Sequence, residues 1–247
     1  MSDTTKKGVV VLLSGGQDSS TCLALAMSTW GHDKVWPLII DYGQRHLIEI
    51  DCAVIVARAM GAREPRILGE RALLELGGAA LTDANVNVNA DATDTGNAYA
   101  EAHGLPSTFV PGRNLLFFTL AAAYAAKVGA QGIVTGVCEA DRAGYPDCRS
   151  EFVDAAKEAL RTALDDPEFD IYAPLLHLSK AGTFELAARL DVLDVIIEST
   201  NTCYHGNRDI KHEWGRGCGG CPACAERESG WQSFVAGKDE LSPHMPR

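Results

Sequence analysis

Apolar residues along this chain form two patterns, short continuous runs and longer segments in which they recur every three or four positions. The short runs are rich in valine, isoleucine and leucine, which is typical of strands buried on both faces of a parallel sheet. Such runs occupy residues 9–13, 35–41, 66–68, 133–137 and 171–175. Pro37 argues mildly against the second run, because proline cannot donate to a strand ladder.

The longer segments alternate with these runs and predict helices. They cover residues 21–29, 46–60, 115–128, 151–164 and 179–190, and Ser179 is placed to cap the last helix. The segment 115–128 is hydrophobic nearly all round, so we expect it to be buried. Strands that alternate with helices predict an α/β fold with a mostly parallel sheet.

Two segments depart from this alternation. Residues 77–108 are rich in asparagine, aspartate and glycine and show neither period, which predicts a lid or a mobile insertion without regular structure. Residues 199–247 carry a cluster of cysteines and predict a small metal-binding subdomain. The α/β domain is therefore expected to span residues 1–198, with the insertion inside it.

A polar turn with two glycines separates the first strand from the first helix. Its sequence is Ser14-Gly15-Gly16-Gln17-Asp18-Ser19-Ser20. Unpaired backbone amides and the helix dipole make such a turn an anion site, and glycine lets a phosphate approach the backbone. The serine hydroxyls add donors, and Asp18 can hold Mg²⁺ against bound phosphates. The turn lacks the lysine of a Walker loop and the glycine spacing of a dinucleotide fold, so it predicts a different kind of phosphate loop.

Four of the eight cysteines crowd together near the C-terminus. They are Cys203, Cys218, Cys221 and Cys224. Four thiolates suit tetrahedral Zn²⁺, and a shell with no open position predicts a structural role. An iron–sulfur cluster is an alternative, since Cys-x2-Cys-x2-Cys also begins ferredoxin-type runs, but the next cysteine of such runs is missing. Free thiols are a third alternative.

Composition is that of an ordinary globular protein and narrows the choice of partners. Hydrophobic residues make up 46% of the 247, and 33 acidic against 22 basic residues give a formal net charge of −11. This acidity argues against a bulk nucleic-acid binder. No stretch approaches the roughly 20 apolar residues of a membrane span, and the apolar run after Lys7 is too short for a signal peptide. We therefore expect a cytoplasmic protein.

The turn and five further stretches resemble known sequences. Residues 14–19 are similar to the pyrophosphate loop (PP-loop) of the N-type ATP pyrophosphatases, which adenylate a substrate oxygen. The other stretches are 41–46 (DYGQRH), 109–114 (FVPGRN), 135–139 (TGVCE), 144–149 (GYPDCR) and 218–224 (CGGCPAC). Through these motifs, in this order over residues 8–236, the chain resembles the 7-cyano-7-deazaguanine synthase family of queuosine biosynthesis.

The resemblance implies a Rossmann-like doubly wound sheet, a homodimer, structural zinc, and ATP-driven conversion of 7-carboxy-7-deazaguanine and ammonia to the nitrile, with Mg²⁺ accompanying ATP. It implies catalytic roles for Asp18, Arg113 and Lys180, the last two as cations for the α-phosphate and the carboxylate. The implied ATP-binding residues are Ser14, Gly15, Gly16, Gln17, Asp18, Ser19, Ser20, Thr21 and Asp41. The implied substrate-binding residues are Tyr42, Arg45, Asn114, Asp141, Tyr145, Asp147 and Arg149, and the metal ligands are Cys203, Cys218, Cys221 and Cys224.

One departure from the family pattern leaves an alternative open. Residues 139–143 read Glu-Ala-Asp-Arg-Ala, where the family carries an aromatic residue and two hydroxyls beside the substrate pocket. A phage-defence relative that stops at an amide, joining the activated base to an amine of protein or DNA, would fit this change. A tRNA-thiolating PP-loop enzyme and a non-enzymatic zinc ribbon that binds nucleic acid are further alternatives.

Overall fold

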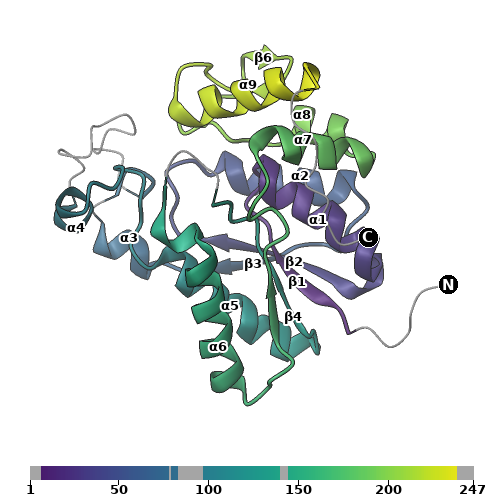
Figure 1. The fold of residues 1–247 in the computed structure, drawn as a ribbon, viewed down its shortest axis with the longest axis vertical. Coiled ribbons are helices and arrows are strands. Elements are labelled where there is room, and N and C mark those ends of the chain that lie inside the picture. Colours follow the sequence, from purple (N-terminus) through teal and green to yellow (C-terminus); the bar gives the residue numbers. More distant parts are fainter. Residues whose placement is uncertain (1–6, 78, 83–96, 140–143, 238–247) are drawn as a thin grey trace.

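A five-stranded parallel sheet forms the centre of the molecule (Figure 1). The computed structural model describes residues 7–77, 79–82, 97–139 and 144–237. The strands are β1 (Val9–Leu12), β2 (Val35–Asp41), β3 (Arg66–Gly69), β4 (Gly132–Val134) and β5 (Asp170–Tyr172). Their order in the sheet is β3-β2-β1-β4-β5, and all four neighbouring pairs are parallel. The chain therefore winds outward from β1 in both directions, as predicted for a Rossmann-like doubly wound fold.

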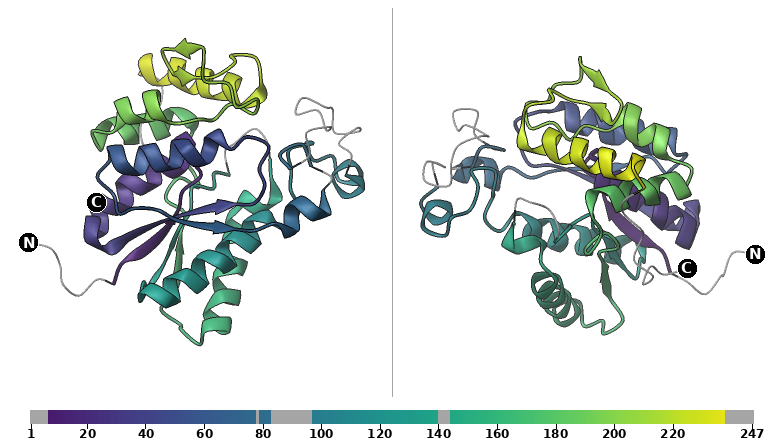
Figure 2. Two further views of the ribbon diagram at one scale, coloured as in Figure 1. Left: turned by 180° about the vertical axis from the view of Figure 1, so that it is seen from behind. Right: turned by 45° about the horizontal axis from the view of Figure 1, so that its top comes forward.

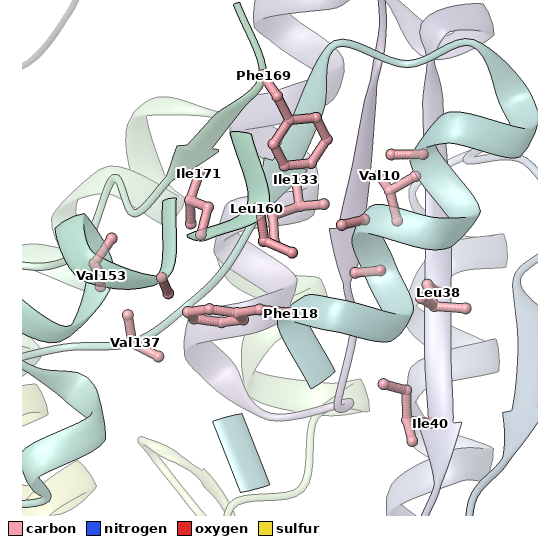
Figure 3. Packing of buried hydrophobic residues seen from close by; sticks show 14 of the residues in the cluster. Val10, Leu38, Ile40, Phe118, Ile133, Val137, Val153, Leu160, Phe169 and Ile171 are labelled. Atoms are coloured by element: carbon pink, nitrogen blue, oxygen red, sulfur yellow. The ribbon is translucent and has the colours of Figure 1, made fainter. Parts of the chain in front are cut away.

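Helices cover both faces of this sheet, because alternate side chains of each strand point to opposite faces. On one face of β1, Val9 and Val11 pack against one group of helices, and on the other face Val10 packs against a second group. The first group is α1 (Gln17–Trp30), α2 (Ile48–Ala59) and α7 (Lys180–Arg189), and the second is α5 (Arg113–Val128) and α6 (Ser150–Leu164). Figure 2 shows the two groups on opposite sides of the sheet. Figure 3 shows Phe118 of α5 among the aliphatic residues of the second core.

The predicted strands and helices are all present, with shifts at their ends. Helix α1 begins at Gln17 instead of residue 21, because the polar loop itself supplies the first turn. Strand β4 ends at Val134, earlier than predicted, because residues 135–138 leave the sheet to line a cavity. Strand β5 also ends earlier than predicted, at Tyr172. Pro37 is accommodated in β2, which pairs with β3 only from Leu38 onward.

The prediction of a structureless segment at 77–108 was wrong for its C-terminal part. Residues 98–102 form the short helix α4 (Ala98–Ala102), and the side chain of Asn97 caps it by accepting from the amides of Tyr99 and Ala100. Another short helix, α3 (Ala72–Leu76), precedes the segment. Residues 78 and 83–96 of the expected lid lie outside the described residues.

The C-terminal region forms an additional layer over α7 (Figure 1). It contains α8 (Leu193–Ser199), the short antiparallel pair β6 (Lys211–His212) and β7 (Gly215–Arg216), and α9 (Pro222–Val235). Phe184 of α7 packs against Trp231 and Phe234 of α9 in a third hydrophobic cluster. Gly230 allows the close approach, since a Cβ there would lie 2.7 Å from the Cβ of Lys180. Among the described helices, none is long and apolar enough to cross a membrane.

Candidate active site

A cavity of about 320 Å³ opens at the carboxyl ends of β1, β2 and β4. Strand β1 is followed by a crossover to β2 on one side, while β4 lies on its other side, so the cavity is at the point where the strand order reverses. Ligands of open α/β sheets bind at such points. The wall is formed by the loop after β1, the start of α5, residues 135–138 and part of the C-terminal region.

The loop after β1 is held open by its glycines and serines. Gly15 has a φ of +82°, and a Cβ at this position would lie 2.4 Å from the carbonyl oxygen of Glu49, so only glycine fits. The hydroxyls of Ser14 and Ser19 lie 2.9 Å apart, and Ser19 Oγ also accepts from the Ser14 amide. Helix α1 starts directly after Gly16, so its first amides have no helical acceptor and face the loop. This arrangement is an anion site.

Asp18 and Lys180 form an ion pair beside this loop. Lys180 Nζ lies 2.9 Å from Asp18 Oδ2, and both side chains line the cavity. Asp18 Oδ1 is buried and has no hydrogen-bond partner among the described residues. Gln17 fixes the start of α7 against α1, because its Nε2 donates to Thr183 Oγ1 at 2.6 Å. The structure thus brings together two residues far apart in sequence that were both predicted for the site.

The opposite side of the cavity is aromatic and carries one arginine. Arg113 begins α5 and faces Tyr42 and Tyr145. Burial lowers the pKa of Arg113, but the facing Tyr42, Tyr145 and Asp147 outweigh this effect and raise it, so the guanidinium stays charged. Burial raises the pKa of Tyr42 to about 12 despite the opposing charge of Arg113. A fixed positive charge beside neutral phenols suits a ligand that has both an anionic group and an aromatic ring.

Asn114 and Asp147 support this side of the cavity. Asn114 Nδ2 donates to the carbonyl oxygen of Asp147 at 3.0 Å and so joins α5 to the short 3₁₀ helix Pro146–Cys148. Asp147 is 8% exposed, and its Oδ1 has no partner within the described part of the chain. Burial raises the pKa of its carboxyl group, which Arg113 partly opposes.

Several predicted residues lie outside the cavity wall. Asp41 ends β2, and its Oδ1 accepts from the Gly43 amide at 3.2 Å. Arg149 is exposed before α6, and Arg45 donates its amide to the Leu81 carbonyl. Thr21 and Ser20 are fully buried one turn behind the loop. Asp141 lies outside the described residues, as do all of 140–143.

The cavity wall includes residues that sequence reasoning missed. Glu49 is four residues before the buried Ala53, so its place on the inward face of α2 was readable from the helical period. Asn201 is 3% exposed, and neither atom of its side-chain amide has a partner among the described residues. Its backbone amide donates to the Gly15 carbonyl at 2.9 Å. Tyr204 also lines the cavity. No sequence signal placed Asn201 or Tyr204 there.

The four clustered cysteines converge as predicted. All four Sγ atoms of Cys203, Cys218, Cys221 and Cys224 lie within 4.8 Å of one another. Cys218 Sγ and Cys224 Sγ are 3.9 Å apart. Sulfurs bound at 2.3 Å to a tetrahedral Zn²⁺ would lie about 3.8 Å apart, so the residues fit a four-coordinate metal. The structure supports a metal site here.

A buried arginine connects the cysteine cluster to the cavity. Arg227 of α9 is 0% exposed. Its side chain donates to Thr202 Oγ1 at 3.0 Å and to the Ile196 carbonyl oxygen at 2.9 Å. Burial lowers its pKa to about 10, although Asp18 opposes the shift. Cys203 follows Thr202 directly, so the metal-site region and the cavity wall share one short segment. The C-terminal region therefore contributes residues to the cavity wall.

A glycine-rich turn at the point where the strand order of a parallel sheet reverses defines an α/β protein with a ligand-binding type of fold. The family model "Queuosine biosynthesis protein QueC" matches residues 8–235, nearly the whole chain. The chain therefore belongs to the QueC family, as the sequence motifs predicted.

Curated relatives agree with this assignment over almost their entire length. A 7-cyano-7-deazaguanine synthase from Bradyrhizobium sp. is 43% identical over 96% of this chain and 98% of its own. The enzymes of the same name from Bordetella pertussis and Albidiferax ferrireducens are 45% and 46% identical over 94% and 93% of this chain and 94% and 97% of their own. Among solved structures, NMN synthetase from Francisella tularensis matches with a TM-score of 0.48 and 18% identity, over 98% of this chain and 91% of its own.

Proposed function

We propose that this protein is a 7-cyano-7-deazaguanine synthase, which uses ATP to convert 7-carboxy-7-deazaguanine and ammonia to the nitrile. One observation carries the proposal: a phosphate loop and an arginine-bearing aromatic wall line the same cavity. The name of relatives that are 43–46% identical supports it. The amide-forming and tRNA-thiolating alternatives have no support among these relatives.

The chemistry explains why the site needs a nucleotide. A carboxylate becomes a nitrile only when both oxygens leave, and neither leaves unaided. The carboxylate attacks the α-phosphate, pyrophosphate departs, and ammonia displaces AMP to give the amide. A second adenylation, on the amide oxygen, releases another pyrophosphate, and loss of AMP and of both protons from nitrogen then gives the nitrile. Both oxygens thus end in AMP, and two molecules of ATP are consumed. Such chemistry depends mainly on positioning and on stabilising charge at phosphorus.

Each part of the cavity has a role in this reaction. The free amides at the start of α1, with Ser14 and Ser19, would hold the leaving pyrophosphate. Asp18 Oδ1 lacks a partner among the described residues and would accept Mg²⁺ that arrives with ATP. Lys180 and Arg113 would neutralise the α-phosphate and the carboxylate of the substrate.

The aromatic wall would bind the deazapurine. Tyr145 offers a ring face, and Asn114 and Asp147 offer polar groups for the edge of the base. Tyr42 would orient Arg113. Roles for Thr21, Asp41, Arg45, Asp141 and Arg149 in binding ATP or substrate stay predictions.

Three further properties follow from the family and the donor set. The cysteine cluster would hold a structural Zn²⁺, since four sulfurs leave no open position for a substrate. A homodimer and a cytoplasmic location, where ATP is available, complete the proposal.

The decisive experiment supplies purified protein with 7-carboxy-7-deazaguanine, ATP, Mg²⁺ and ammonium and identifies the product by mass spectrometry. We expect the nitrile, with the amide appearing earlier. The amide alone at long times would favour the amide-forming relative, and no ATP-dependent product would refute the proposal. Asp18→Ala should abolish turnover while leaving the metal content unchanged.

A further inference from the structure

Glu49 is a carboxylate in the cavity wall that the proposed roles leave unused. It lies in the first turn of α2, and its own carbonyl oxygen lies against the tight turn at Gly15. Its side chain lines the cavity and is partly exposed there, and the positive charge of Arg113 acts on it. A carboxylate that lines the cavity next to the loop after β1 is within reach of the reacting groups, which points to a chemical role.

The surroundings of Glu49 set its proton affinity. Burial raises its pKa from the usual 4.5 to about 7, and the charge of Arg113 on α5 opposes the rise. Among the residues that the structure describes, Glu49 also interacts electrostatically with the hydroxyl of Tyr42, directly after β2, and the thiol of Cys52, on its own helix. Burial raises the pKa of both, so they stay neutral near pH 7. Near neutral pH the carboxylate can therefore both accept and release a proton.

Resting on the proposed function, we propose that Glu49 binds ammonium and takes a proton from it, producing the ammonia that attacks the acyl adenylate. One N–H bond of ammonium breaks, and its proton passes to a carboxylate oxygen of Glu49. The freed electron pair on nitrogen forms the C–N bond, and the C–O bond to AMP breaks with its electron pair staying on AMP. A second proton then leaves nitrogen for AMP or water, and Glu49 returns its proton to solvent.

The position of Glu49 favours this role over recognition of the base. The residue lies beside the phosphate loop through the contact at Gly15, and the acyl adenylate would form next to the pyrophosphate that this loop would hold. The ring face and polar groups suited to a deazapurine come from a different part of the chain, around Tyr145 and Asn114. A carboxylate is also the natural acceptor for a small cation.

The test separates adenylation from amide formation with the variant Glu49→Gln. Exchange of labelled pyrophosphate into ATP, driven by 7-carboxy-7-deazaguanine without ammonium, reports adenylation alone. We expect exchange to stay within about threefold of wild type, and amide formation from ammonium to slow by about 10²–10⁴-fold, the usual contribution of a proton acceptor. The matched control is Asp51→Asn, which removes an exposed carboxylate from the same helix and should change neither step.

Two further measurements test whether the slower amide formation comes from the loss of a proton acceptor. The amide-forming step of wild type should fall as pH drops through about 7 and level off above it, whereas Glu49→Gln should keep gaining rate above this pH as free ammonia increases. Hydroxylamine, which is already largely neutral near pH 7, should restore the variant to within about tenfold of wild type as the hydroxamate forms. Equal slowing of exchange and amide formation, or a raised KM for the deazapurine alone, would overturn the role of Glu49 and leave the proposed function standing. Absence of exchange in the wild type would overturn both.

Discussion

Glu49 also makes a prediction about stability that needs no substrate. Its carboxyl group has an ordinary pKa of 4.5 in the unfolded chain and about 7 in the folded one. Below about pH 4 both states hold the proton and the group has no effect. As pH rises, the unfolded chain ionises first, so folding becomes less favourable until the folded group ionises as well. Above about pH 7 the ionised carboxylate lowers the free energy of unfolding by a constant amount. At about 1.4 kcal/mol per unit of pKa shift, this amount is about 3 kcal/mol.

Glutamine has nearly the same shape without the charge, so Glu49→Gln should remove this cost. We expect the variant to be more stable than wild type by about 2–3 kcal/mol at about pH 8, because water in the cavity screens part of the penalty, and by less than about 1 kcal/mol at about pH 5. Urea unfolding of both proteins at each pH measures the difference, and comparing the two differences cancels every other titrating group. A difference in stability that does not change with pH would refute the raised pKa of Glu49 in the folded protein.

Other substitutions test the rest of the site. Gly15→Ala should lower the free energy of unfolding by at least about 2 kcal/mol and abolish pyrophosphate exchange, since φ is +82° and the new Cβ would meet the Glu49 carbonyl at 2.4 Å; normal exchange would contradict the loop geometry. Lys180→Met should slow adenylation by about 10²–10³-fold by removing the cation paired with Asp18; an unchanged exchange rate would exclude that role. Cys221→Ser should lose about one equivalent of zinc by elemental analysis and become sensitive to protease near the cysteine cluster; full metal content would contradict the four-sulfur site.

The fold was largely readable from the sequence because its signals are local. A run such as Val9–Leu12 is apolar on both faces, and the alternation of such runs with helical periods specifies a parallel sheet. The ends of the elements were less predictable. Gln17 and Asp18 are polar, so the apolar pattern could not show that they form the first turn of α1, and α4 is too short for a helical period to be visible.

The site was predictable only where a motif carried it. The loop at 14–20 and the cysteine spacing each have a physical reason within a short stretch of sequence. No short stretch of sequence marks Asn201 or Arg227, because their positions depend on how the C-terminal region packs against α1 and α7. Arg149 is the reverse case. Its place in a motif that matches the family predicted that it binds substrate, but in the structure its side chain is exposed.

In the proposed reaction, both oxygens of the carboxylate leave on AMP while the loop after β1 holds pyrophosphate. The direct measurement uses 7-carboxy-7-deazaguanine labelled with ¹⁸O in both carboxylate oxygens and follows the label by mass spectrometry. We predict that every AMP carries one ¹⁸O in its phosphate, that each nitrile is accompanied by two labelled AMP, and that pyrophosphate is unlabelled. Label appearing in water or in inorganic phosphate, with unlabelled AMP, would contradict the claim.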